Sequence, residues 1–311
     1  MMPDVSPPAP AVTTQAQTAG DFLFREVATP DGPRRYKLYL PKGYSKARPS
    51  PLLVVLHGCT QDPDDIARGT QFNSLAGEKG ILVAYPEQPQ KANGLKCWNW
   101  FDTAHQQRDK GEPALIADIT RQVIANYSVD SRRVYIAGLS AGGAMALTVA
   151  YAYPDIYAAA GIHSGIAYGA AGSIGEAIKA MASGVSAPDS LASAVVKGMG
   201  SRRSFPAIFF QGGADRSVKV VNVGQAVAQL SELNSPGGLT RRPATTSISE
   251  GGYHYSKTTF GKGKPLIEEW VVDELGHAWS GGSSDGTYTD AKGPSASREM
   301  LRFFLEHPRR K

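Results

Sequence analysis

Short apolar runs alternate with longer segments of helical character along most of this chain. The runs include PLLVVLHG (51–58), ILVAYP (81–86), RRVYIAG (132–138), YAAAGIHSG (157–165), FPAIFFQGG (205–213) and LIEEWVVDEL (266–275). Continuous apolar runs of this length are typical of strands that are buried on both faces. Strands that alternate with helices form a mostly parallel sheet with helices on both faces. The sequence therefore predicts the α/β class.

Turn and cap signals place the other elements. FLFREVA and RRYKLYL flank the turn sequence TPDGP, which predicts an antiparallel hairpin over 22–40. The segment 62–80 is predicted as one helix that begins at the N-cap Asp62 and ends at Gly80. Further helices are predicted over 112–127, 141–153, 218–233 and 294–307.

Composition narrows the function classes. The 311 residues are 41% hydrophobic and 20% charged, with a net charge of +5, which predicts one globular domain over 21–311. The basic residues are scattered, so we expect no nucleic-acid partner, and no apolar run is long enough to span a membrane. Residues 1–20 are predicted to be a disordered leader without a signal peptide, or the stub that remains after a signal is removed.

The motif G-x-S-x-G surrounds Ser140 in IAGLSAGGAMAL (136–147). The pattern is short enough to arise by chance, but here it follows an apolar strand and opens a helix, as a nucleophile elbow requires. Gly138 and Gly142 would let the backbone pass close to its neighbours at the sharp turn. We predict that Ser140 is a nucleophile; the alternative is an ordinary turn from strand to helix.

A nucleophilic serine needs a base and a carboxylate that orients the base. Asp215 follows the strand at 205–213 and His277 follows the strand at 266–275, so the order is serine, acid, histidine. We predict these two as the partners of Ser140. His163 is the rival base and Asp273 is the rival acid.

Two backbone N–H groups are predicted to form an oxyanion hole. One belongs to Ala141, directly after the nucleophile, and the other to Cys59 in the turn LHGCTQ. The N–H of Thr60 is the alternative to that of Cys59.

Cys59 and Cys97 are the two cysteines of the chain. Their surroundings offer no further ligands at metal-binding spacing, so no metal is predicted. We favour a disulfide that ties the loop CWNWF (97–101) to the oxyanion turn, which would indicate a secreted or periplasmic protein. Free thiols in the cytoplasm are the alternative.

Several longer motifs occur together in order: LHGCTQDPDDIA, CWNWF, VYIAGLSAGGAM and GHAWSGG. With these motifs the chain resembles the polyhydroxyalkanoate (PHB) depolymerase family of serine esterases, which is related to feruloyl and acetylxylan esterases. The resemblance covers about 22–306 and implies an α/β-hydrolase fold, the triad Ser140, Asp215 and His277, the Cys59–Cys97 bridge and no cofactor.

The chain departs from the family at two points. The segment QGGAD (211–215) stands where relatives often have a His-Gly pair before the acid, which alters the surroundings of Asp215. No signal peptide or polymer-binding domain is evident, so we expect weak attack on solid polymer.

The resemblance implies an ester substrate: a short-chain polyhydroxyalkanoate or its oligomers, with a feruloylated or acetylated plant cell-wall ester as the alternative. A third hypothesis is that the protein binds a ligand without catalysing a reaction. We expect the segment 167–203 to form short helices that cover the pocket. The residues expected to contact the substrate are Trp98, Trp100, His163, Tyr253 and Trp279. The oligomeric state is not predicted.

Overall fold

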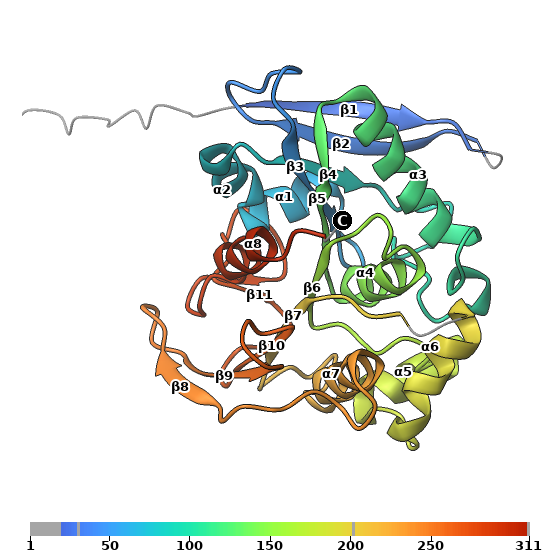
Figure 1. Cartoon of the computed structure of the whole chain (residues 1–311), viewed down its shortest axis with the longest axis vertical. Helices are drawn as coiled ribbons and strands as arrows, with labels where there is room; N and C mark the ends of the chain where they lie inside the picture. The colour runs from blue at the N-terminus through green and yellow to red at the C-terminus, as the bar shows by residue number, and fades with distance from the viewer. Residues whose placement is uncertain (1–19, 30–31, 201–202, 310–311) are drawn as a thin grey trace, which may run out of the picture.

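A computed structural model describes residues 20–29, 32–200 and 203–309. A ten-stranded sheet runs through the molecule in the order β1-β2-β4-β3-β5-β6-β7-β10-β9-β8 (Figure 1). The strands are β1 (Asp21–Val27), β2 (Arg34–Leu40), β3 (Ser50–Leu56), β4 (Leu82–Pro86), β5 (Val129–Leu139), β6 (Ala159–His163), β7 (Ala207–Gly212), β8 (Thr245–Ile248), β9 (His254–Phe260) and β10 (Ile267–Val272). Two short strands, β11 (Trp279–Ser280) and β12 (Thr289–Asp290), pair separately.

The centre of the sheet is parallel, and both of its ends are antiparallel. The six strands from β4 to β10 in the sheet order pair in parallel. Helices lie between β3 and β4, β4 and β5, β5 and β6, and β6 and β7, as parallel connections require. Strands β6 and β7 are buried along their whole length, which explains their continuous apolar sequences. In the sheet, β3 lies between β4 on one side and β5 on the other. The carboxyl ends of β3 and β5 therefore lie side by side although about eighty residues separate them.

Helices cover both faces of the sheet (Figure 1). One face carries α1 (Pro63–Thr70), α2 (Phe72–Lys79) and α8 (Ala296–Glu306). The other carries α3 (Gly111–Asn126), α4 (Ala141–Ala152), α6 (Leu191–Met199) and α7 (Val221–Asn234), with α5 (Ile174–Ser183) packed on α7. The α/β class and the helices on both faces are thus confirmed.

The predicted helix over 62–80 is two helices. Its ends are confirmed, since the Asp62 side chain accepts a hydrogen bond from the Asp65 N–H and Gly80 ends α2 in the left-handed conformation. The break lies at Gln71, which has a φ of 58° and caps α1 through its N–H. A left-handed glutamine has no strong sequence signal, so the helical pattern appears continuous.

The β8–β9 pair was not predicted as strands. All four residues of β8 are exposed, so this edge strand lacks the alternation of apolar and polar residues that identifies a half-buried strand. The hairpin of β1 and β2 is confirmed by its antiparallel register, although the tip of its turn lies outside the described residues.

Some predictions on organisation stay predictions. Helices α5 and α6 form in the segment 167–203 as expected, but nothing tests its role as a pocket cover. The single-domain organisation of 21–311 is likewise untested, and the leader, apart from Gly20, lies outside the described residues. Within the described part of the chain, no helix combines the length and the apolar character that a membrane crossing requires.

Candidate active site

A sharp turn joins β5 to α4 at Ser140. Ser140 has a φ of 58° and a ψ of −120°, a conformation that residues with side chains rarely adopt. Two glycines permit the turn: a β-carbon on Gly138 would lie 2.2 Å from the Gly142 carbonyl oxygen, and one on Gly142 would lie 2.3 Å from the Leu56 carbonyl oxygen. The Ser140 hydroxyl is thereby held at the carboxyl edge of the sheet, at the start of a twelve-residue helix.

The Ser140 hydroxyl, His277 and Asp215 form one chain of hydrogen bonds. His277 Nε2 lies 2.9 Å from Ser140 Oγ, and His277 Nδ1 lies 2.8 Å from Asp215 Oδ2. Because a carboxylate only accepts, Nδ1 carries the proton and Nε2 is left to accept from the serine hydroxyl. This arrangement allows the ring to take the proton of Ser140.

Asp215 is almost fully buried, with 2% of its surface exposed. Burial by itself raises the pKa of its carboxyl, but the hydrogen bond and charge of His277, with the N–H groups of Val218 and Ser217, outweigh it and lower the pKa. Gln211 Nε2 also donates to Asp215 Oδ2, at 3.1 Å. Gln211 is the first residue of the departure QGGAD, so this amide is part of the altered surroundings.

The rival base His163 and the rival acid Asp273 do not take the places of His277 and Asp215. The ring of His277 bonds to Asp215, whereas the backbone N–H of Asp273 continues the pairing toward His254. His163 is fully buried, and its Nε2 accepts the Ser280 N–H at 3.0 Å. Burial lowers the pKa of His163 to about 3, so it is a neutral structural histidine.

The two predicted oxyanion donors have no partner among the described residues. The Ala141 N–H is the first of α4 and the Cys59 N–H lies in the turn after β3, so both are left to bind a ligand. The Thr60 N–H donates to the Leu95 carbonyl at 2.6 Å, which makes it unavailable. The alternative donor is therefore disfavoured.

Cys59 and Cys97 form the disulfide, so the favoured pairing is confirmed over free thiols. The bridge joins the turn after β3 to the loop that follows β4, 38 residues later. The Thr60–Leu95 bond ties the same two segments beside it. The loop after β4 therefore holds the backbone around the Cys59 N–H in place through these two links.

Most residues expected to contact the substrate do not face an open site. Trp98, His163 and Trp279 have no exposed surface, so they would not meet a substrate without a rearrangement of the residues that cover them. Trp98 packs on His57, and Trp279 packs between Phe72 and His163. Apolar side chains beside a catalytic motif enter the core when the loop folds back on the sheet.

The other two expected contacts are also engaged elsewhere. Trp100 is 7% exposed and packs edge-to-face on Phe101. The Tyr253 hydroxyl donates to Asp290 at 2.9 Å, and Lys292 lies over its ring.

Tyr288 is an aromatic residue at the site that the sequence did not reveal. It is 45% exposed, its ring meets the His277 ring edge-to-face, and its hydroxyl lies 3.3 Å from Thr60 Oγ1. Its φ of 52° is held because the Asp65 carboxylate binds both the N–H and the hydroxyl of Thr287. The sequence around Tyr288, rich in Gly, Thr and Asp, predicts only a loop. The position of Tyr288 at the site is therefore seen only in the folded structure.

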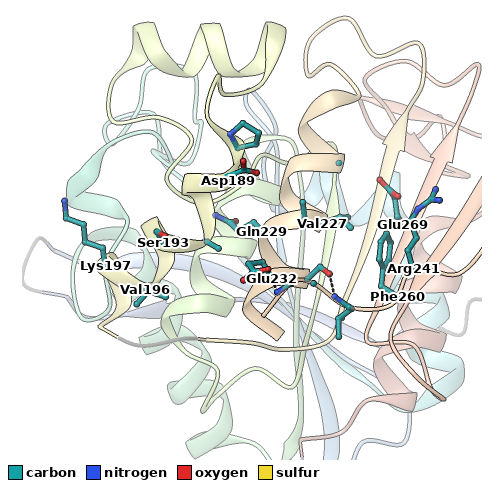
Figure 2. Close-up of a pocket in the computed structure, with 18 residues that line it drawn as sticks. Asp189, Ser193, Val196, Lys197, Val227, Gln229, Glu232, Arg241, Phe260 and Glu269 are labelled. Carbon is teal, nitrogen blue, oxygen red and sulfur yellow. Dashed lines mark hydrogen bonds between the residues drawn. The ribbon is translucent and has the colours of Figure 1, made fainter. Parts of the chain in front are cut away.

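A large cavity lies away from Ser140, Asp215 and His277. Its volume is about 1000 Å³, and residues of α6, α7, β9 and β10 line it. Figure 2 shows these lining residues, and none of the predicted site residues is among them. Its charged lining includes Glu232, Arg241 and Glu269. Among the described residues, no group of three or more His, Cys, Asp or Glu side chains is arranged to hold a metal ion.

Comparisons with known proteins identify relatives of this chain. A poly(3-hydroxyalkanoate) depolymerase C from Paucimonas lemoignei is 31% identical over 231 residues, which are 73% of this chain and 55% of that protein. A feruloyl esterase B from Thermothelomyces thermophilus is 32% identical over 142 residues, 45% of this chain and 48% of that protein. The chain thus spans about half the length of these curated relatives.

The fold matches solved esterases. An acetyl xylan esterase from Aspergillus awamori superposes with a TM-score of 0.71 at 19% identity, over 91% of this chain and 99% of that one. A thermostable esterase gives 0.56 at 21% identity, over 93% of this chain and 64% of that one. The predicted α/β-hydrolase fold is confirmed. The model of the family described as esterase PHB depolymerase matches residues 34–246, and the chain therefore belongs to the esterase PHB depolymerase family.

Proposed function

We propose that this protein is a serine esterase that hydrolyses carboxylic esters through an acyl-enzyme. The observation that carries the proposal is the chain of hydrogen bonds from Ser140 through His277 to Asp215, placed at a strained elbow. The strain at Ser140 supports the proposal because such backbone conformations persist where function requires them.

In the first step, Ser140 Oγ attacks the ester carbonyl while His277 Nε2 takes its proton. Asp215 holds the imidazole and stabilises its positive charge. The N–H groups of Ala141 and Cys59 receive the developing oxyanion, and the positive end of the α4 dipole adds to this stabilisation. The carbon–oxygen bond of the alcohol then breaks, and His277 returns its proton to the leaving alcohol.

In the second step, water attacks the acyl-enzyme. His277 takes a proton from this water, the oxyanion forms again at the same two N–H groups, and the bond to Ser140 breaks. His277 then protonates Ser140, which releases the carboxylic acid and restores the enzyme. The described side chains suffice for every proton transfer in this cycle.

The substrate proposed is a short-chain polyhydroxyalkanoate such as poly(3-hydroxybutyrate), or its oligomers. The family match and the identity to a poly(3-hydroxyalkanoate) depolymerase over most of this chain support this choice. The second candidate is a feruloyl or acetylxylan ester, favoured by the identity to a feruloyl esterase B over a shorter stretch. The Cys59–Cys97 disulfide supports action in an oxidising compartment, outside the cytoplasm.

A substrate panel with a nucleophile variant tests the proposal. The wild type should hydrolyse p-nitrophenyl butyrate, and a folded Ser140→Ala variant should lose about 10⁴-fold or more in kcat/KM. Ser193→Ala, in the large cavity of Figure 2, is the matched control and should keep full activity. Release of hydroxybutyrate from oligomers, compared with ferulate from methyl ferulate, separates the two substrate classes.

Two outcomes would overturn parts of the proposal. A Ser140→Ala variant as active as the wild type would exclude Ser140 as the nucleophile. A wild type without activity on any ester would favour a non-catalytic binding protein.

A further inference from the structure

Glu112 is a buried carboxylate that the proposed reaction does not use. It lies in the first turn of α3 and is 4% exposed. Its two oxygens accept three hydrogen bonds: from the Gln88 side-chain amide, from Asn99 Nδ2 at 2.6 Å and from the Asn99 N–H at 2.7 Å. All three donors belong to the loop that follows β4, so one carboxylate fixes this loop to α3.

From Glu112 the hydrogen bonds continue into the turn at 93–97. The Asn99 side-chain oxygen accepts from Asn93 Nδ2 at 2.8 Å. The Asn93 side-chain oxygen in turn accepts the N–H groups of Leu95, at 3.0 Å, and Cys97, at 3.3 Å. Gln88 Nε2 reaches the same turn directly, by donating to the Cys97 carbonyl at 3.0 Å.

Two links join this turn to the oxyanion turn. The disulfide connects Cys97 to Cys59, and the Leu95 carbonyl accepts the Thr60 N–H. The 93–97 turn is therefore linked both to Cys59 and to the residue that follows it.

His57 makes a third link. The Gln88 N–H donates to His57 Nε2 at 3.0 Å, so Nδ1 carries the proton and donates to the Gly58 carbonyl at 2.8 Å. His57 is fully buried, and burial lowers its pKa. A neutral ring in this single tautomer fixes the backbone just before Cys59.

We propose that Glu112 is a positioning residue for catalysis: through Gln88 and Asn99 it holds the Cys59 N–H in the direction of the oxyanion. The inference rests on the proposed esterase function. Glu112 touches no reacting atom, and its effect is exerted at the transition state, where the oxyanion forms. Its loss should therefore lower kcat and leave KM nearly unchanged.

Glu112→Gln tests this role at nearly constant volume. The new NH₂ group would face donors, since all three partners of Glu112 donate, so at least one bond must break. Glu268→Gln is the matched control. Glu268 is 2% exposed and also has three partners. It accepts hydrogen bonds from Arg302 Nη2 at 2.6 Å and Trp270 Nε1 at 3.1 Å, and it forms an ion pair with Lys257 Nζ at 3.1 Å. These partners lie on α8, β9 and β10 and not in the oxyanion turn.

The experiment measures kcat and KM on p-nitrophenyl butyrate, per active site titrated with a fluorophosphonate. It also measures inhibition by a trifluoromethyl ketone, whose adduct with Ser140 carries a tetrahedral oxyanion. Glu112→Gln should lower kcat at least tenfold, keep KM within threefold and weaken the ketone in parallel with kcat. Glu268→Gln should keep kcat and ketone affinity within twofold of the wild type, even if its Tm falls as much as the Tm of Glu112→Gln. Equal kcat values in the two variants would overturn the proposal.

Asn93→Ala keeps the test decisive if Glu112→Gln does not fold. Asn93 is partly exposed and lies between Glu112 and the oxyanion turn. Its loss should lower kcat several-fold with KM unchanged, and an unchanged kcat would overturn the proposal. An inactive wild type would contradict the esterase function itself. An active wild type, with equal kcat values for the Glu112→Gln and Glu268→Gln variants, would contradict only the role of Glu112.

Discussion

The carboxyl edge of the sheet around Ser140 and the cavity between α6 and α7 differ in what they offer a ligand. The cavity has a volume of about 1000 Å³, and its charged lining residues include Glu232, Arg241 and Glu269 (Figure 2). The edge brings together Ser140, Asp215 and His277 across 62 and 137 residues of sequence. It also holds Ser140, Thr60 and Tyr288 at positive φ. Ordered polar groups and backbone strain, more than volume, locate the proposed site.

The largest difference between the two regions should appear when a carboxylate is neutralised in each. Asp215→Asn leaves the geometry but removes the charge that orients and stabilises the His277 imidazolium, so kcat should fall by about 10⁴-fold. Glu269→Gln, in the cavity beside Arg241, should keep kcat within twofold. Steady-state kinetics on p-nitrophenyl butyrate measures both. A comparable loss in Glu269→Gln would place the cavity in the active site.

The disulfide fixes the edge and has no counterpart in the cavity. Removing it in Cys59→Ala/Cys97→Ala frees a loop of 38 residues, which should cost about 3–4 kcal/mol of unfolding free energy. It should also lower kcat about tenfold, since the turn around the Cys59 N–H loses one of its ties. Calorimetry and kinetics measure these effects. Dithiothreitol should lower the Tm of the wild type and leave that of the variant unchanged; an unchanged wild type would contradict the prediction.

His163 lies just below the edge and makes stability depend on pH. The folded protein keeps its ring neutral because burial lowers its pKa to about 3, while the unfolded chain takes up a proton near pH 6.5. The unfolding free energy should therefore fall as the pH falls, by about 2 kcal/mol between pH 7 and pH 5 from this group. Urea unfolding at both pH values measures the loss, which should shrink in His163→Gln.

The exposed His254 is the control for this titration. Its hydrogen bond to Glu274 raises its pKa, so its contribution to stability is present at low pH and is lost as the pH rises. His254→Gln should therefore not reduce the loss of stability on acidification. A smaller loss in this variant than in His163→Gln would contradict the assignment of the effect to His163.

Tyr288 should give the smallest effect. Removing its ring in Tyr288→Ala takes away an exposed aromatic surface beside His277, which should raise KM about fivefold for an apolar ester. Tyr288→Phe keeps the ring and should stay within twofold of the wild type. Phe24→Ala, a similarly exposed aromatic on the edge strand β1, is the control and should change nothing. A KM for Tyr288→Ala equal to that of the control would remove Tyr288 from the site.

The strands, and hence the edge where the site lies, could be predicted because buried parallel strands are apolar and end in recognisable turns. Ser140 directly follows β5, and Asp215 and His277 lie in the loops just after β7 and β10, so the topology places them at one edge of the sheet. The pairing of Cys59 with Cys97 could be predicted because the chain has two cysteines.

Other features depended on packing that no local pattern encodes. Trp98 and Trp279 lie in motifs beside the site, yet their large apolar rings are more stable in the core. Tyr288 reaches the site because Asp65, more than two hundred residues earlier, holds Thr287. The left-handed conformation of Gln71 breaks a helix whose sequence looks continuous.

The long sequence separations between β3, β5, β7 and β10 also concern the order in which the chain folds. The strand pairs and the hydrogen bonds at their ends close loops of many tens of residues, and each closure costs chain entropy before any contact repays it. The elbow at Ser140 joins the adjacent elements β5 and α4, whereas its proposed base lies 137 residues later in the chain. A chain in which β7 and β10 have not yet paired with the centre of the sheet would therefore carry Ser140 without its proposed base and acid.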